Sequence, residues 1–166
     1  MSAARLSVGG RLPALTLPDG DGSPVRLRDP ARGAPVVLLL PDHPAQGFAG
    51  YAESLAAARE RLRAWYGRPL LVTGAGGGSP LRRPHLPVLN DREGSLRSRS
   101  GAGGKAGALV VADRWGQIYL LTATEQASDL PAIDALEEWV KYLATQCPEC
   151  GVIDEPGHGE WTVAAG

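Results

Sequence analysis

A run of apolar residues, Val36-Val37-Leu38-Leu39-Leu40, dominates the hydrophobic pattern of this chain and ends at Pro41. A short polar turn follows, and residues 45–66 then carry apolar side chains at steps of three and four. The first pattern is typical of a buried parallel strand and the second of an amphipathic helix. We therefore predict a strand over residues 35–40 that leads directly into a helix over residues 45–66.

The rest of the pattern predicts two hairpins, two short strands and a last helix. Alternating runs around an Asp-Gly turn in residues 7–29 predict the first hairpin, and residues 108–121 predict the second. Buried strands are expected over residues 70–73 and 86–89. A helix capped by Asp129 is expected to follow, with its apolar face at Ile133, Leu136, Val140 and Leu143.

This order of elements predicts an α/β fold. A strand–helix–strand unit has parallel strands, and a hairpin adds antiparallel ones, so the central sheet is expected to be mixed, with helices on both faces. We expect residues 1–146 to form one domain and residues 147–166 to form a tail. Residues 95–106 contain few apolar side chains, so we expect a solvated basic loop there, carrying Arg97, Arg99 and Lys105.

Composition excludes some classes of partner. The net charge of −1 indicates no general attraction to nucleic acid or to anionic lipid. Because no apolar run approaches the ~20 residues that span a bilayer, we expect no membrane insertion and a cytoplasmic location. Trp139 and Tyr142 lie outside the apolar stripe of the last helix, which indicates a surface for a protein partner or a second copy of the chain.

Several short motifs between residues 8 and 145 resemble the redoxin branch of the thioredoxin fold. This branch includes peroxiredoxins of the AhpC/TSA type and thioredoxin-like thiol reductases. The resemblance implies a thioredoxin-like fold and, if the protein is an enzyme, a thiol-dependent oxidoreductase. In chain order, the matching segments are Val8-Gly9 with Leu12-Pro13, Asp19-Gly20 before Val25-Arg26-Leu27, the strand that ends at Pro41, residues 88–94 and residues 110–118.

The reactive residues of that family are absent from the matching positions. In peroxiredoxins a threonine stands four residues after the proline that ends the strand, and the peroxidatic cysteine stands seven residues after it. Counted from Pro41, these positions are Ala45 and Phe48, and the Cys-x-x-Cys of the thiol reductases falls on the same two. The family's later proline or arginine falls near Ala106-Gly107. We therefore expect no catalytic residue at the family position and interpret Phe48 as a core residue.

Two polar residues remain in the turn after the strand. Asp42 and His43 are candidates to line a pocket at this point, and a solvated turn is the alternative.

The two cysteines of the chain, Cys147 and Cys150, form a Cys-Pro-Glu-Cys-Gly motif that resembles a zinc knuckle. A two-residue gap lets both sulfur atoms reach one metal ion, and structural zinc takes four ligands. His158 is a candidate third ligand, with Asp154 or Glu155 as a fourth, or a second chain can contribute its own pair. A redox-active dithiol and two inert thiols are the alternatives.

Two functions are compatible with these patterns. The first is a peroxiredoxin-like protein without peroxidatic activity, which acts as a binding, regulatory or assembly module with a C-terminal metal or thiol site. The second is a thiol-disulfide oxidoreductase that uses Cys147 and Cys150 as its dithiol.

Overall fold

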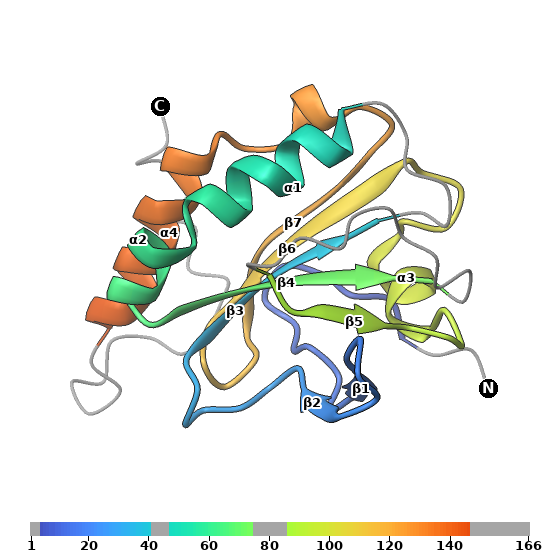
Figure 1. The fold of residues 1–166 in the computed structure, drawn as a ribbon, viewed down its shortest axis with the longest axis horizontal. Coiled ribbons are helices and arrows are strands. Elements are labelled where there is room, and N and C mark those ends of the chain that lie inside the picture. The colour runs from blue at the N-terminus through green and yellow to red at the C-terminus, as the bar shows by residue number, and fades with distance from the viewer. Residues whose placement is uncertain (1–3, 41–46, 75–85, 147–166) are drawn as a thin grey trace.

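A five-stranded mixed sheet forms the centre of the molecule (Figure 1). The computed structural model describes residues 4–40, 47–74 and 86–146. The strands lie in the order β5-β4-β3-β6-β7, in which β3, β4 and β5 are parallel, and β6 and β7 run antiparallel to their neighbours. Their bounds are β3 Ala34–Leu39, β4 Gly67–Thr73, β5 Val88–Asn90, β6 Gly107–Ala112 and β7 Ile118–Thr124.

Three helices cover one face of this sheet: α1 (Phe48–Ala57), α2 (Arg59–Ala64) and α4 (Ile133–Thr145). The other face is covered by the N-terminal segment, by the hairpin of β1 (Thr16–Pro18) and β2 (Pro24–Arg26), and by α3 (Ser95–Ser100). Side chains alternate along β3: Val36 belongs to the helix-side core, and Val37 and Leu39 to the other. The predicted mixed sheet, N-terminal hairpin and helices on both faces are confirmed.

The predicted helix over residues 45–66 is wrong in its bounds. Among the described residues, the helical segment starts at Phe48 and is interrupted at Ala58, which separates α1 from α2. Helix α2 ends at Ala64, and Tyr66, whose φ of 60° lies in the left-handed region, precedes β4. Gly67 is the first residue of β4, where a Cβ would lie 2.7 Å from Val140 Cγ1. Glycine is therefore required here because α4 packs closely against the strand.

Asp129 does not cap the last helix as predicted. It ends a short 3-10 turn, η1 (Ala127–Asp129), and accepts a hydrogen bond from Thr124 Oγ1 at 2.6 Å. Helix α4 begins at Ile133, and its preceding residue Ala132 makes no side-chain capping bond. The Asp129 side chain was expected to cap α4, but it instead binds Thr124 at the end of β7.

Trp139 and Tyr142, the expected partner surface, are half-buried in this chain. The Trp139 ring lies 6.4 Å from the ring of Tyr119 on β7 and 6.1 Å from the ring of Tyr142, measured between centroids. Trp139 therefore packs on β7, and Tyr142 packs on Trp139. None of the helices in the described part of the chain is both long enough and apolar enough to cross a membrane.

The predicted second hairpin is confirmed, and Asp113 organises its turn. Its Oδ1 accepts hydrogen bonds from the backbone N–H groups of Trp115 and Gln117 at 2.9 and 2.8 Å. Burial raises the pKa of the Asp113 carboxyl above its ordinary value, and these backbone donors and Arg11 only partly offset that effect. The ionised carboxylate is therefore less favoured in the folded protein than in the unfolded chain.

Replacing Asp113 with asparagine is expected to make stability less dependent on pH. Because the folded-state pKa is raised, the stability that Asp113 contributes is complete below the unfolded value of 3.8 and is lost as pH rises through the folded-state pKa. The Asp113→Asn variant keeps an amide oxygen as acceptor but does not ionise. Its free energy of unfolding relative to the wild type should rise as the pH increases from below 3.8 towards neutrality. Urea denaturation across this range measures the difference, and a constant or falling difference contradicts the argument.

Candidate functional site

The connection between β3 and α1 is where the resemblance places the family's reactive centre. Asp42, His43 and Ala45 lie outside the described residues, so the structure describes only the two ends of this connection. Leu40 donates its N–H to Val72 O at 3.0 Å and holds the end of β3 against β4. On the other side, Gly47 precedes α1 with a φ of 94°.

Phe48 is the first residue of α1 and is fully buried in the helix-side core. Its ring lies against Gly107, the first residue of β6, where a Cβ would stand 2.4 Å from Phe48 Cε1. The interpretation of Phe48 as a core residue is confirmed. The structure thus brings together the two positions where the resemblance expects a cysteine and a proline or arginine. A phenyl ring packed on a glycine supplies neither a nucleophile nor a proton donor or acceptor.

Tyr51, one turn further along α1, provides a polar contact near this site. Its hydroxyl donates to Pro131 O at 2.7 Å and joins α1 to the segment that precedes α4. Burial raises the pKa of Tyr51 to about 12, so the phenol remains a protonated donor at neutral pH. This arrangement suits a structural tie between α1 and the start of α4, and it disfavours a role for Tyr51 as a general base.

Arg97 lies near this site, in a position that the sequence pattern did not predict. It was expected in a solvated loop, but residues 95–100 form α3, and Leu96 is buried in the core on that face. Arg97 donates from Nη2 to Leu40 O. A cation therefore lies at the carboxyl end of β3, where the chain enters the β3–α1 connection.

The signal for α3 was present in the sequence as a carboxylate ahead of a short polar run. Asp91, which is buried, accepts hydrogen bonds from the N–H groups of Ser95, Leu96 and Arg97 at 3.0, 2.9 and 3.1 Å. These groups have no partner within a helix of this length, so a capping carboxylate can start the helix despite its low hydrophobicity. Another of the predicted loop cations, Lys105, pairs with Glu125 at 3.2 Å.

Cys147, Cys150 and His158 also lie outside the described residues, but the path of α4 leads towards them. Helix α4 begins after Pro131, whose carbonyl oxygen accepts from Tyr51 in α1, and its second residue, Asp134, pairs with Arg61 in α2. It ends at the edge of the sheet opposite the start of α1: Val140 packs beside Gly67, and the Lys141 ammonium lies 5.4 Å from the ring of Trp65. In Figure 1, α4 runs alongside α2, on the side of the molecule away from the start of α1.

No group of three or more His, Cys, Asp or Glu side chains in the described part of the chain could hold a metal ion. This part of the chain also contains no cysteine in its sequence. The predicted zinc ligands all belong to residues 147–166.

Comparison with known proteins relates this chain to others through its structure. No protein-family model and no curated protein sequence matches it. A Chlorobium tepidum protein described as a thiol:disulfide interchange protein DsbE superposes with a TM-score of 0.67 at 18% identity, covering 84% of this chain and 99% of its own. The bacterioferritin comigratory protein of Xanthomonas campestris, which has alkyl peroxide reduction activity, gives a TM-score of 0.65 at 16% identity, covering 82% of this chain and 99% of its own.

AhpC of Mycobacterium tuberculosis superposes with a TM-score of 0.64 at 15% identity, covering 88% of this chain and 98% of its own. At such identities the likeness establishes the fold. The order and pairing of strands, the hairpin ahead of the sheet and the helices on both faces agree with these structures. The chain therefore has the thioredoxin-like fold that peroxiredoxins and thiol:disulfide interchange proteins share.

Proposed function

We propose that this protein is a redoxin-fold binding or regulatory module without peroxidatic activity. The observation that carries the proposal is the contact between Phe48 and Gly107 at the start of α1. A redoxin that reduces peroxide needs a thiolate, and the positive end of a helix is a favourable place for one. In this protein the Phe48 ring is buried at that place, and Gly107 has no Cβ to clash with it. Such a contact supports a scaffold role.

The cysteine pair at residues 147 and 150 is proposed to hold a metal ion, with zinc as the fitting choice. The pair follows the C-terminal end of a helix, where the helix dipole is negative, and Glu149, Asp154 and Glu155 add negative charge. These charges oppose a free thiolate, whereas a bound cation favours one. His158 with Asp154 or Glu155, or the pair of a second chain in a homodimer, would complete four ligands.

The alternative is a thiol-disulfide oxidoreductase that uses Cys147 and Cys150. The fold favours it, because thiol:disulfide interchange proteins and peroxidases are among the proteins with similar structures. The path of α4 counts against it, since the helix ends at the edge of the sheet opposite the start of α1.

A double variant, Cys147→Ser with Cys150→Ser, separates these functions. We expect untagged wild-type protein to carry zinc that a chelator removes and the double variant to carry none, measured by elemental analysis. We expect neither protein to reduce peroxide or insulin disulfides above the rate of the buffer. The matched control is Ser98→Ala, which changes an exposed residue of α3 and should leave the zinc content unaltered.

Three outcomes would count against this proposal. Peroxide turnover that survives in the double variant contradicts a non-peroxidatic protein. Insulin reduction that Cys147→Ser alone abolishes favours the oxidoreductase. Wild-type protein without metal under reducing conditions excludes the zinc site and leaves the scaffold role to be judged by the activity assays.

A further inference from the structure

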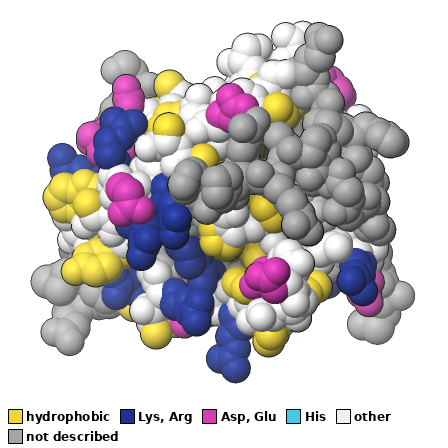
Figure 2. Space-filling model, viewed as in Figure 1, with side chains coloured by type: hydrophobic (Ala, Val, Ile, Leu, Met, Phe, Trp, Pro, Cys, Tyr) yellow, Lys and Arg dark blue, Asp and Glu magenta, His cyan; other side chains and the backbone are white. Residues whose placement is uncertain are grey.

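A basic pocket lies at the amino edge of the parallel strands, opposite the edge where α1 begins. It has a volume of about 410 Å³, and its walls include Arg32, Arg59, Arg63, Tyr66, Arg68 and Pro87. Figure 2 shows Lys and Arg side chains gathered in a dark-blue band over α2 and the start of β4. The volume lies within the range of small-molecule sites, about 300–1,000 Å³.

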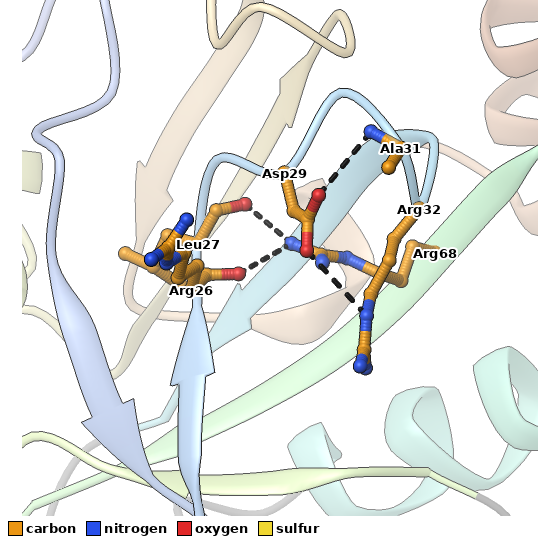
Figure 3. Close-up of polar contacts among 6 residues, drawn as sticks. All are labelled: Arg26, Leu27, Asp29, Ala31, Arg32 and Arg68. Carbon is orange, nitrogen blue, oxygen red and sulfur yellow. Dashed lines mark hydrogen bonds and ion pairs between the residues drawn. The ribbon is translucent and has the colours of Figure 1, made fainter.

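Arg68 is fixed in the wall of this pocket by the backbone. Its Nη2 donates to Arg26 O at 2.8 Å and to Leu27 O, so the guanidinium joins β4 to the end of β2 (Figure 3). Its Nε and Nη1 are buried and have no hydrogen-bond partner among the described residues. These two nitrogens are closed to solvent, so Arg68 adds a fixed positive charge to the wall of the pocket.

The groups around Arg68 affect its pKa, and ion pairs neutralise only part of the pocket's positive charge. Burial lowers the pKa of Arg68, the nearby Asp29 raises it, and Arg32 lowers it further, so the environment as a whole disfavours its charged form. Asp29 pairs with Arg32 at 3.4 Å, and Glu60 pairs with Arg63 at 3.6 Å. No carboxylate of the described residues forms an ion pair with Arg59 or Arg68.

The four arginines are thus paired with two carboxylates, which leaves an excess of two positive charges. The whole chain has a net charge of −1, so an anion would be drawn to this pocket by its local field and not by the protein's overall charge.

One wall of the pocket is aromatic. The side chain of Tyr66 is 64% exposed, and the guanidinium of Arg114, from the turn between β6 and β7, lies 5.8 Å from the centre of its ring. This contact limits the positions that the ring can take. Tyr66 therefore offers a flat apolar surface beside the arginines, which suits the organic part of a charged ligand.

We propose that this pocket binds the dianionic phosphate group of a small phosphate monoester. Arg59 and Arg63 receive the phosphate oxygens, with Arg68 as a fixed charge in the wall, because guanidinium groups match phosphate in geometry and two uncompensated positive charges match a dianion. Tyr66 contacts the organic part. The site lies at the edge of the sheet opposite Phe48 and does not depend on the cysteine pair, so it adds a ligand-binding function to the scaffold.

The test is a titration of the full chain followed by NMR of the backbone amides and the arginine Nε–H groups. Inorganic phosphate, adenosine 5′-monophosphate and adenosine are added separately at constant ionic strength set by chloride. We expect saturable shifts at Arg59, Arg63 and Arg68 with both phosphate compounds, and tighter binding of the monophosphate. Adenosine should cause no saturable shift, since it lacks the charged group.

Two variants on the same short helix provide the contrast. Arg59→Gln removes an unpaired cation of the pocket and should weaken phosphate binding about tenfold, the order of one charge-assisted hydrogen bond. Arg61→Gln is the matched control with the same charge change. Arg61 faces α4, where it contacts Asp134 and Glu137 at 3.3 and 3.1 Å, so phosphate affinity should stay within about twofold.

Three results would overturn the proposal. The first is a set of NMR chemical-shift changes that depend on ionic strength alone. The second is an equal loss of phosphate affinity in Arg59→Gln and Arg61→Gln. The third is binding of adenosine as tight as that of the monophosphate. Inorganic phosphate bound as tightly as the monophosphate would reassign the site to free phosphate and remove the role of Tyr66. Arg63→Gln repeats the test if Arg59→Gln does not fold, which circular dichroism establishes first.

Discussion

Replacing Phe48 with alanine is expected to lower the free energy of unfolding by about 3–5 kcal/mol, the range for truncating a buried phenylalanine. The side chain is completely buried at the start of α1, and it fills the space left open by Gly107 on β6. Its loss removes apolar contacts and leaves a cavity between a helix and the central sheet. Urea or thermal denaturation measures the effect. The matched control is Tyr66→Ala, which truncates a largely exposed aromatic side chain and should cost less than about 1 kcal/mol.

The contact itself is tested by combining this change with Gly107→Ala. Alone, Gly107→Ala places a Cβ 2.4 Å from Phe48 Cε1 and should cost about 1–3 kcal/mol through overpacking. In the double variant the ring is gone, so the added methyl group no longer clashes and the two costs should not add. Strict additivity would show that the ring does not lie against β6, and it would remove the main support for the proposed scaffold role.

Replacing Asp91 with alanine is expected to cost about 2–3 kcal/mol and to loosen α3. The carboxylate accepts three backbone N–H groups at the start of this helix, and its loss would leave Ser95, Leu96 and Arg97 without that partner. Hydrogen exchange should accelerate at these three amides by more than it does elsewhere. Arg97 in this helix donates a hydrogen bond to Leu40 O. The end of β3 should therefore become more mobile as well.

Asp19→Ala is the matched control for this prediction. Asp19 accepts the N–H groups of Asp21 and Ser23 in the hairpin turn at 3.0 and 2.8 Å, but these bonds are exposed to solvent. Water can replace them, so the cost should be about 1 kcal/mol or less. Equal losses in the two variants would mean that burial of the Asp91 network adds no stability.

Elements set by local pattern were predictable, and elements set by contacts between distant residues were not. The β6–β7 hairpin and the run at β3 were recognised because alternation and turn residues act over a few positions. By contrast, α3 contains one buried leucine and depends on the capping bonds of Asp91. Gly67 at the start of β4 leaves room for Val140, and this role depends on a residue far along the chain.

At the family position the sequence was sufficient to show that Ala45 and Phe48 stand where the resemblance expects reactive residues. It could not show that Phe48 lies against Gly107, because that contact joins residues far apart in the chain. The basic pocket had no sequence signal either: Arg32, Arg59 and Arg68 come from three separate segments.

The sequence by itself determined the order of the sheet strands and of the last helix, the mixed sheet and the absence of a thiol before residue 147. These follow from short-range periodicity and from residue identity alone. Only the tertiary structure decided that Phe48 fills the space over Gly107, that α4 ends at the edge away from α1, and that four arginines share one pocket. Such contacts arise when packing of the sheet and helices brings distant segments together, and no local pattern along the chain records them.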